Sequence, residues 1–453
     1  MKRRAFLAAT ALLSLFAPSA VLAARKKKAE SSAPTRATTK SSERSSTRGK
    51  GRSGRAEVER GARGERDGRG SRRESRHESR RERKRNARRN ERAAVEREAV
   101  ERPATHASPP PAVDTRSSFN LADEQAAVWR NYELVSSLTI NEMRGKLRVW
   151  LPLALYRDCS WQRSLGHTWQ GNFSNAGIYR DPLSDMELFY ADWQDAGSVK
   201  PQLQVVSQVA RQDRHFDITR RGGGGERSEV LRRCLQATPL LPIDGLVRQT
   251  AERAIGRIKD PVAQGKAIYD WVIDNSIYDP QVPGIGRGDV EALLDSGRLS
   301  GKSADISLLF VALCRSVGIP ARPVFGMRVD SSRVMASLGA SGNLRDSQHC
   351  RAEFYTPGYG WIPVDPSDVR KSIHDERLTG SDSRLAVLRK LLFGVWEANW
   401  VALNSALDVR LPGADERTLP FLILPQAVAA SERFDSKDSR RISYTVSASR
   451  STL

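Results

Sequence analysis

GKSADISLLFVALCRSVGIPAR, residues 301–322, carries the clearest structural signal in the chain. Apolar residues recur at helical spacing from about Ser303 to Val317, and this spacing predicts a helix with one buried face. The predicted face consists of Ile306, Leu309, Phe310, Leu313 and Val317. Gly318 and Pro320 follow, and these residue types commonly end a helix.

The letters Gly301-Lys302-Ser303 also match the end of a phosphate-binding P-loop. A P-loop has four residues between its two glycines and follows a buried strand. Here only three residues separate Gly297 from Gly301, and the preceding segment 290–294 has a helical pattern. Both the spacing and the context therefore argue against a phosphate-binding loop.

Two further segments occur downstream: QHCRAEFY (348–355) and GWIPVDPSD (360–368). Taken in this order, the three segments resemble the transglutaminase-like superfamily over about residues 240–370. The resemblance implies an α+β fold with a papain-like core, in which a helix bundle packs on an antiparallel sheet. The strands expected in that sheet cover 322–329, 350–355 and 361–364.

The resemblance also implies where a catalytic triad would lie. Members of this superfamily have a cysteine at the start of the buried helix, a histidine at the start of the next strand and an aspartate in an Asp-Pro pair. The matching residues here are Ser303, His349 and Asp365. A helix N-terminus stabilises a thiolate, the histidine takes its proton and the aspartate orients the imidazole. Because His349 and Asp365 fall on adjacent predicted strands, a hairpin would place them side by side.

Ser303 departs from the family pattern. A serine hydroxyl is much less acidic than a thiol, and about 1 kcal/mol from a helix N-terminus does not make it an alkoxide. Ser303 would need His349 as a full general base, as in serine proteases. Serine is also a favoured N-cap, so its hydroxyl could instead accept hydrogen bonds from the backbone of Asp305 or Ile306.

Three interpretations of Ser303 stay open from the sequence. The nucleophile has been lost and the domain binds ligands, or serine is a working nucleophile, or the serine is an introduced substitution. The sequence of the source gene would test the third interpretation.

The chain has four cysteines, Cys159, Cys234, Cys314 and Cys350. Cys314 lies about 16 Å from Ser303 along the predicted helix, at about 1.5 Å per residue. Cys350 follows His349 on a strand, so their side chains point to opposite faces. Neither is expected to replace the missing nucleophile. Cys159 and Cys234 could form a disulfide. We expect no cofactor, zinc site or calcium loop, because metal-ligand spacings and acidic loops are missing from the sequence.

The N-terminus is typical of an export signal. Lys2, Arg3 and Arg4 precede a short apolar run from Ala5, and small residues near position 23 allow cleavage. We therefore predict a signal peptide at 1–23, a periplasmic or secreted protein, and no transmembrane span after cleavage.

Residues 24–118 form a basic segment rich in Arg, Ser and Glu. Residues 25–116 hold 29 Lys and Arg against 14 Asp and Glu, which accounts for most of the chain's net charge of +21. With almost no large apolar side chains, the segment is predicted to be disordered. It could bind anionic envelope polymers or serve only as a solvated spacer. Because it lacks interleaved aromatic residues, specific nucleic-acid binding is not expected.

The remaining chain is predicted to contain three parts. Residues 119–235 and 376–453 show alternating patterns typical of β-rich regions, and 236–375 form the transglutaminase-like core with further helices at 243–258 and 262–277. The pattern does not say whether the β-rich regions form one sandwich or two.

These features give two functional hypotheses. In the first, the exported domain is catalytically impaired and holds a peptide or protein segment in its cleft, near the cell envelope. In the second, a Ser303-His349-Asp365 triad performs acyl transfer or amide hydrolysis. The Gly- and Ser-rich segment 330–347 would form a rim or lid, and Arg322, Glu353 and Trp361 are expected to be structural. Substrate identity and oligomeric state are not indicated by the sequence.

Overall fold

The computed structural model describes residues 128–451, apart from positions 142, 223, 415–417 and 430–431. The predicted signal peptide and basic segment lie outside the described residues. Within the described part of the chain, no helix is long and apolar enough to cross a membrane.

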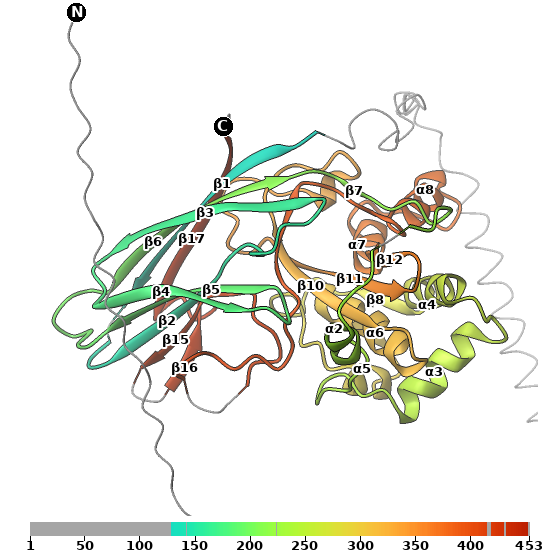
Figure 1. The fold of residues 1–453 in the computed structure, drawn as a ribbon, viewed down its shortest axis with the longest axis horizontal. Coiled ribbons are helices and arrows are strands. Elements are labelled where there is room, and N and C mark those ends of the chain that lie inside the picture. Colours follow the sequence, from blue (N-terminus) through green and yellow to red (C-terminus); the bar gives the residue numbers. More distant parts are fainter. Residues whose placement is uncertain (1–127, 142, 223, 415–417, 430–431, 452–453) are drawn as a thin grey trace, which may run out of the picture. The chain divides into compact units, whose positions relative to one another are not determined.

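Two antiparallel sheets pack face to face and form a β-sandwich (Figure 1). The first has the order β17-β1-β6-β3 and the second β16-β15-β2-β5-β4. Their bounds are β1 Arg130–Ile140, β2 Leu147–Pro152, β3 Gln162–Gly171, β4 Asn175–Asp181, β5 Met186–Trp193, β6 Gln202–Arg211, β15 Gln426–Ala429, β16 Glu432–Asp435 and β17 Ile442–Ser451. Apolar side chains from both sheets, such as Leu134 and Phe189, are buried between them.

Strands from the two ends of the described chain pair within the same sheets. β17 is antiparallel to β1 from Asn131 opposite Ser451 to Ile140 opposite Ile442, and β15 pairs with β2. Residues 376–451 therefore do not build a sheet of their own, and the two predicted β-rich regions form one sandwich. Sequence periodicity could not decide this, because it gives the face of a strand but not its partner.

The core sheet has the antiparallel order β12-β11-β10-β14. Its strands are β10 Ala321–Arg328, β11 Gln348–Thr356, β12 Gly360–Val364 and β14 Trp400–Asn404. The first three match the predicted strands, whereas β14 comes from the region expected to lie outside the core.

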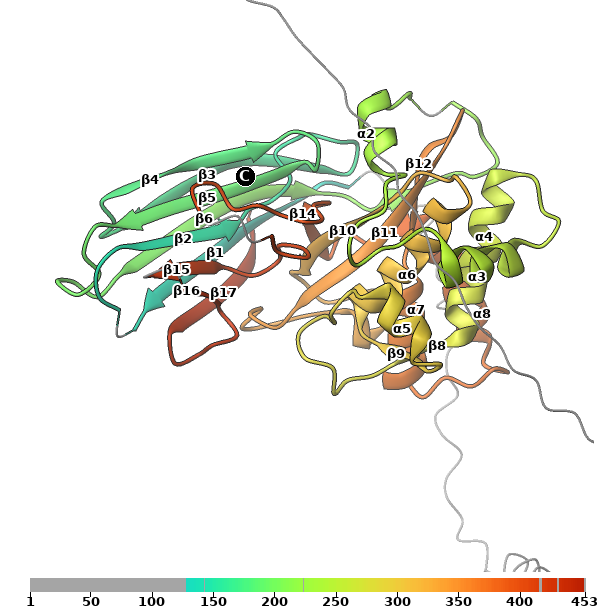
Figure 2. The ribbon, with the colours of Figure 1, turned by 90° about the horizontal axis from the view of Figure 1, so that it is seen from below.

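Helix α6, Ser303–Ser316, packs against β10 and β11 and is enclosed by other helices (Figure 2). All of its residues are buried. The sequence predicted burial of one apolar face only, and the structure shows that the whole helix is buried. Helices α3 (Gly245–Ile255), α4 (Pro261–Asn275), α5 (Val290–Asp295) and α7 (Pro366–Asp375) also contact α6, so α6 is covered on more than its sheet-facing side.

Three of the other helices lie close to their predicted positions: α3 Gly245–Ile255, α4 Pro261–Asn275 and α5 Val290–Asp295. Helices α2 Ser228–Arg233, α7 Pro366–Asp375 and α8 Ser383–Leu391 were not predicted, and α2 and α8 lie in the two regions that were expected to be β-rich. Short strands β8 Ser276–Tyr278 and β9 Leu299–Gly301 run parallel, and β7 Arg214–His215 pairs with β13 Val395–Trp396.

Gly265 lets α4 approach the core sheet closely. A Cβ at this position would lie 2.5 Å from the Phe354 ring, which is fully buried on β11. Alanine in a helix normally gains about 1 kcal/mol over glycine. We expect Gly265→Ala instead to lose about 1–3 kcal/mol of unfolding free energy through overpacking, measured by urea denaturation.

Gly177→Ala on β4 is the matched control, because a Cβ there meets no atom within 4 Å. Its stability should stay close to that of the parent. Equal stability of Gly265→Ala and the parent would contradict the close packing of α4 on Phe354.

Candidate active site

The start of α6 is held by the carboxylate of Asp305. Its Oδ2 accepts a hydrogen bond from the backbone N–H of Lys302 at 2.9 Å, and its Oδ1 accepts from Gly288 at 2.8 Å. A carboxylate near a helix N-terminus also interacts favourably with the helix dipole. Asp305 thus ties the loop before α5 to the first turn of α6 and fixes Ser303.

Ser303 is the first residue of α6 and is 7% exposed. Its Oγ accepts a hydrogen bond from the backbone N–H of Cys350 at 3.2 Å. The alternative that its hydroxyl caps the helix by binding Asp305 or Ile306 is wrong. Lys302 occupies the N-cap position, so the Ser303 side chain lies inside the first turn and points to β11.

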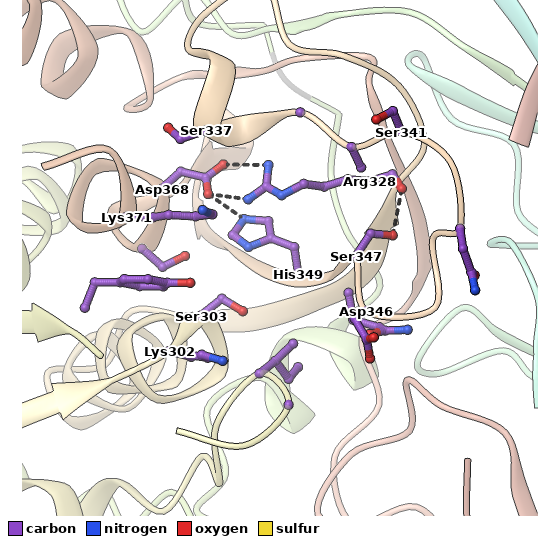
Figure 3. Close-up of a pocket in the computed structure, with 18 residues that line it drawn as sticks. Lys302, Ser303, Arg328, Ser337, Ser341, Asp346, Ser347, His349, Asp368 and Lys371 are labelled. Carbon is purple, nitrogen blue, oxygen red and sulfur yellow. Dashed lines mark hydrogen bonds and ion pairs between the residues drawn. The ribbon is translucent and has the colours of Figure 1, made fainter. Parts of the chain in front are cut away.

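His349 is the second residue of β11 and faces Ser303 across one end of a cavity (Figure 3). Its Nε2 lies 2.8 Å from Asp365 Oδ2 and 3.4 Å from Asp368 Oδ1. The other ring nitrogen, Nδ1, is turned toward the side of the cavity where Ser303 lies (Figure 3). Among the described residues, no hydrogen bond joins Ser303 to His349.

Asp365 has two roles in the structure. It is the N-cap of α7, where its Oδ1 accepts from the backbone N–H of Asp368 at 3.0 Å and from Ser367 Oγ at 2.9 Å. Its Oδ2 contacts His349, and Arg351 Nε lies 3.2 Å from the same oxygen. The cap fixes the carboxylate so that it can orient the imidazole.

Sequence reasoning missed Asp368 and Arg328. Asp368 is fully buried, and Arg328 from β10 binds its two oxygens at 2.5 and 3.3 Å. The signal was present, because Asp368 follows Asp365 by three residues and therefore shares its side of the α7 N-terminus. Arg328 gave no signal, since only the tertiary structure brings the end of β10 beside the first turn of α7, where Arg328 meets Asp368.

Burial lowers the pKa of His349, and Arg328 acts in the same direction, while Asp368 and Asp365 oppose the shift. Although burial opposes it, the guanidinium of Arg328 leads the charges that hold the pKa of Asp368 below its usual range. A neutral imidazole with Nε2 directed at carboxylates would carry its proton there, leaving Nδ1 to accept a proton.

His349, Asp365 and Asp368 form a cluster whose ligand atoms lie within 4.8 Å of one another. The spacing alone would suit a divalent cation. However, Arg328 and Arg351 already neutralise the two carboxylates from within 4 Å, so a cation would meet two buried positive charges. The two carboxylates are therefore better suited to accept a hydrogen bond from Nε2–H of His349 than to bind a metal.

The cavity beside Ser303 has a volume of about 390 Å³. Part of the predicted rim, including Ser341 and Ser347, lines it opposite α7. The sandwich braces this segment: Leu344 N–H donates to Val446 O of β17 at 2.8 Å, and Arg345 Nη2 donates to Ser436 O at 2.9 Å. Through these two hydrogen bonds the sandwich supports this wall of the cavity.

Arg322, Glu353 and Trp361 form a separate cluster in which Glu353 is buried and the other two are half-buried. Glu353 accepts from Arg322 at 2.6 Å and from Arg214 at 2.5 Å, and the Arg322 guanidinium lies 4.1 Å from the Trp361 ring centre. None of these residues lines the cavity at Ser303, so their contacts are those of structural residues, as the sequence suggested.

All four cysteines are free thiols. The Cys159–Cys234 disulfide considered from the sequence is not formed: Cys159 packs with a cluster around Trp161, and Cys234 follows α2 beside a different pocket. Cys314 and Cys350 are fully buried, burial raises their pKa, and neither lines the cavity.

The fold is that of a papain-like domain, and Ser303 lies at the start of its central helix, facing His349 across the cavity. Residues 248–366 match the model of the Transglutaminase-like superfamily. The chain is 32% identical over 321 residues to a Haemophilus influenzae protein described as "Uncharacterized protein", covering 66% of this chain and 85% of that protein. The chain belongs to the transglutaminase-like superfamily.

Solved structures of low similarity were also found. One is of "a Putative Cysteine Protease from Cytophaga hutchinsonii", with 15% identity, a TM-score of 0.42, and coverage of 72% of this chain and 89% of that chain. Another is the periplasmic domain of TgpA from Pseudomonas aeruginosa bound to ethylmercury, with 18% identity, a TM-score of 0.30, and coverage of 52% and 93%.

The lowered pKa of His349 makes folding depend on pH. In the unfolded chain a histidine titrates near about pH 6.5. As pH falls below that value, the unfolded chain takes up the proton first, so the unfolding free energy decreases. We expect His349→Gln to reduce this loss of stability between about pH 6.5 and 5, measured by urea unfolding at a series of pH values.

His215 is the control, because burial also lowers its pKa. His215→Gln should remove only the part of the pH-dependent stability loss that is due to His215, and the part due to His349 should stay. An unchanged pH profile in His349→Gln would show that His349 is not held neutral by burial.

Asp368 compensates the buried charge of Arg328. We expect Asp368→Asn to cost about 3–5 kcal/mol of unfolding free energy, since it leaves an unpaired buried guanidinium. An Arg328→Met/Asp368→Asn double variant should recover much of this loss, measured by urea unfolding. A loss that is additive in the double variant would argue against the pairing.

Proposed function

We propose that this chain is an exported transglutaminase-like protein that binds a peptide or protein segment in the Ser303 cavity and is catalytically impaired. The observation that carries the proposal is the position of the Ser303 hydroxyl. Its Oγ accepts from the backbone of Cys350 and makes no hydrogen bond to His349 among the described residues.

A serine nucleophile depends on its base more strongly than a cysteine does. The hydroxyl must pass its proton to His349 as it attacks a carbonyl, whereas a thiol can ionise before attack. An oxygen is also smaller than sulfur and reaches less far from the helix. A misplacement of about 1 Å can cost on the order of a hundredfold in rate, so the observed position favours impaired chemistry.

The shape and polarity of the cavity support ligand binding. Its volume of about 390 Å³ falls in the range of small-ligand sites. Serine, asparagine and glutamine side chains line it, together with glycines that leave backbone groups accessible. These groups can donate to and accept from the amides of a peptide.

An active serine enzyme is the second candidate. It is favoured by the His349 side chain, which is buried, has a lowered pKa and is oriented through Nε2 by Asp365. In that case Ser303 Oγ would attack an amide carbonyl and pass its proton to His349, which would then protonate the departing amine. Ser303 Oγ accepts from the Cys350 N–H, so its own hydroxyl hydrogen is still available. A small rotation of the side chain would let this hydrogen reach His349.

The proposed location follows from the N-terminal sequence. A signal peptide at 1–23 would export the chain, and the basic segment 24–118 would hold it near anionic envelope polymers. This part of the proposal rests on sequence alone.

The two candidates differ in their response to substitution of Ser303. We expect the parent and Ser303→Ala to be equally inactive in amine incorporation and deamidation of glutamine-containing peptides. Ser303→Cys should gain activity, on the order of a hundredfold over Ser303→Ala, because the surrounding groups suit a thiolate.

A Ser303→Cys/His349→Gln double variant is the control and should lose the gained activity. Turnover by the parent that Ser303→Ala abolishes would overturn the impaired-enzyme proposal and support a serine nucleophile. Inactivity of all variants together with no peptide binding would refute both candidates.

A further inference from the structure

The charged groups of the Ser303 cavity are unevenly placed. Lys302 and Lys371 line the side that carries Ser303, whereas Asp346 lies across the cavity (Figure 3). Arg328 and Asp368 also line it, but they are buried and neutralise each other. The charge that a ligand meets next to Ser303 is therefore set by the two lysines.

Lys302 is the lysine whose charge is not compensated by a nearby carboxylate. It is half-buried, and none of the described carboxylates lies within ion-pair distance of its ammonium group. Lys302 directly precedes Ser303 in the chain, and its backbone N–H is held by a hydrogen bond to Asp305. Holding a lysine beside a partly enclosed cavity without a counter-charge is unfavourable, and an anionic ligand group would compensate it.

Lys371 reinforces this charge from α7. Its ammonium pairs with Asp375 and lies 5.5 Å from the Tyr278 ring centre. These contacts hold the side chain in one place, and its 22% exposure leaves part of it open to a ligand. Because Asp375 is not among the cavity-lining residues, the side of Lys371 that faces the cavity keeps a positive potential.

We propose that the peptide bound in the Ser303 cavity carries a carboxylate side chain or carboxyl terminus that pairs with Lys302, supported by Lys371. This inference rests on the proposed peptide-binding function. A carboxylate is favoured over a phosphate, because the site offers two separate ammonium groups and the forked guanidinium of Arg328 is already bound to Asp368.

The test measures binding of fluorescent glutamine-containing peptides to the full-length protein. One glutamate is moved along the peptide one position at a time, and glutamine, lysine or phosphoserine replaces it in matched peptides. We expect one glutamate position to bind about tenfold more tightly than its glutamine counterpart, and this preference should fall with added salt.

Lys302→Gln should remove the glutamate preference, so that the glutamate peptide and its glutamine counterpart bind with equal affinity. Lys371→Gln should reduce the preference in part. Lys390→Gln, an exposed residue of α8 outside the cavity, is the matched control and should change nothing.

Each other outcome contradicts the inference in its own way. Peptides that bind without preference for glutamate, or a preference that survives Lys302→Gln, would refute the carboxylate pairing and leave peptide binding intact. Tighter binding of phosphoserine would replace the carboxylate by a phosphate. If no peptide binds the parent at any charge, the proposed function fails, and the inference fails with it.

Discussion

The buried charges around His349 constrain the whole core. Two carboxylates, Asp365 and Asp368, face one imidazole nitrogen, and Arg328 and Arg351 approach them from the sheet. None of these groups could be buried alone without a large desolvation cost. Strands β10 and β11 and helix α7 must therefore keep their register for the charges to balance. The register of the sheet and the position of the imidazole are determined together.

The histidine network serves the fold as well as any chemistry at Ser303. An intact histidine–aspartate pair is often taken as a sign of catalysis. In this protein Asp365 also caps α7, and Asp368 neutralises a buried arginine that joins β10 to α7. The network would be required for folding even if the nucleophile did no chemistry. Its presence is thus compatible with a binding protein, and the atom that distinguishes the two functions is Oγ of Ser303.

The sandwich contributes to the site although it supplies no member of the histidine network. β17 comes from the end of the described chain, completes the first sheet beside β1, and binds the backbone of Leu344, which lies between the cavity-lining residues Asn343 and Asp346. The turn after β16 does the same for Arg345 through Ser436. A wall supported at both points by sheet residues loses less conformational entropy when a ligand binds.

The sequence by itself predicted the central helix, the first three strands of the core sheet and three candidate site residues, Ser303, His349 and Asp365. The apolar spacing of 303–317 and the stop at Gly318 and Pro320 predict α6, and such local features depend on residues close together in the chain, so periodicity suffices to predict them. His349 and Asp365 were instead predicted from the resemblance of their sequence motifs to the transglutaminase-like superfamily, and the structure places them in hydrogen-bond contact.

Only the tertiary structure decided which distant residues meet. Arg328 reaches Asp368 through strand pairing, the backbone of Cys350 takes the Ser303 hydroxyl, and β14 joins the core sheet from beyond residue 375. Strand partners and the balance of buried charge depend on contacts between segments far apart in sequence. An alternating pattern fixes which face of a strand is buried but leaves its neighbours undetermined.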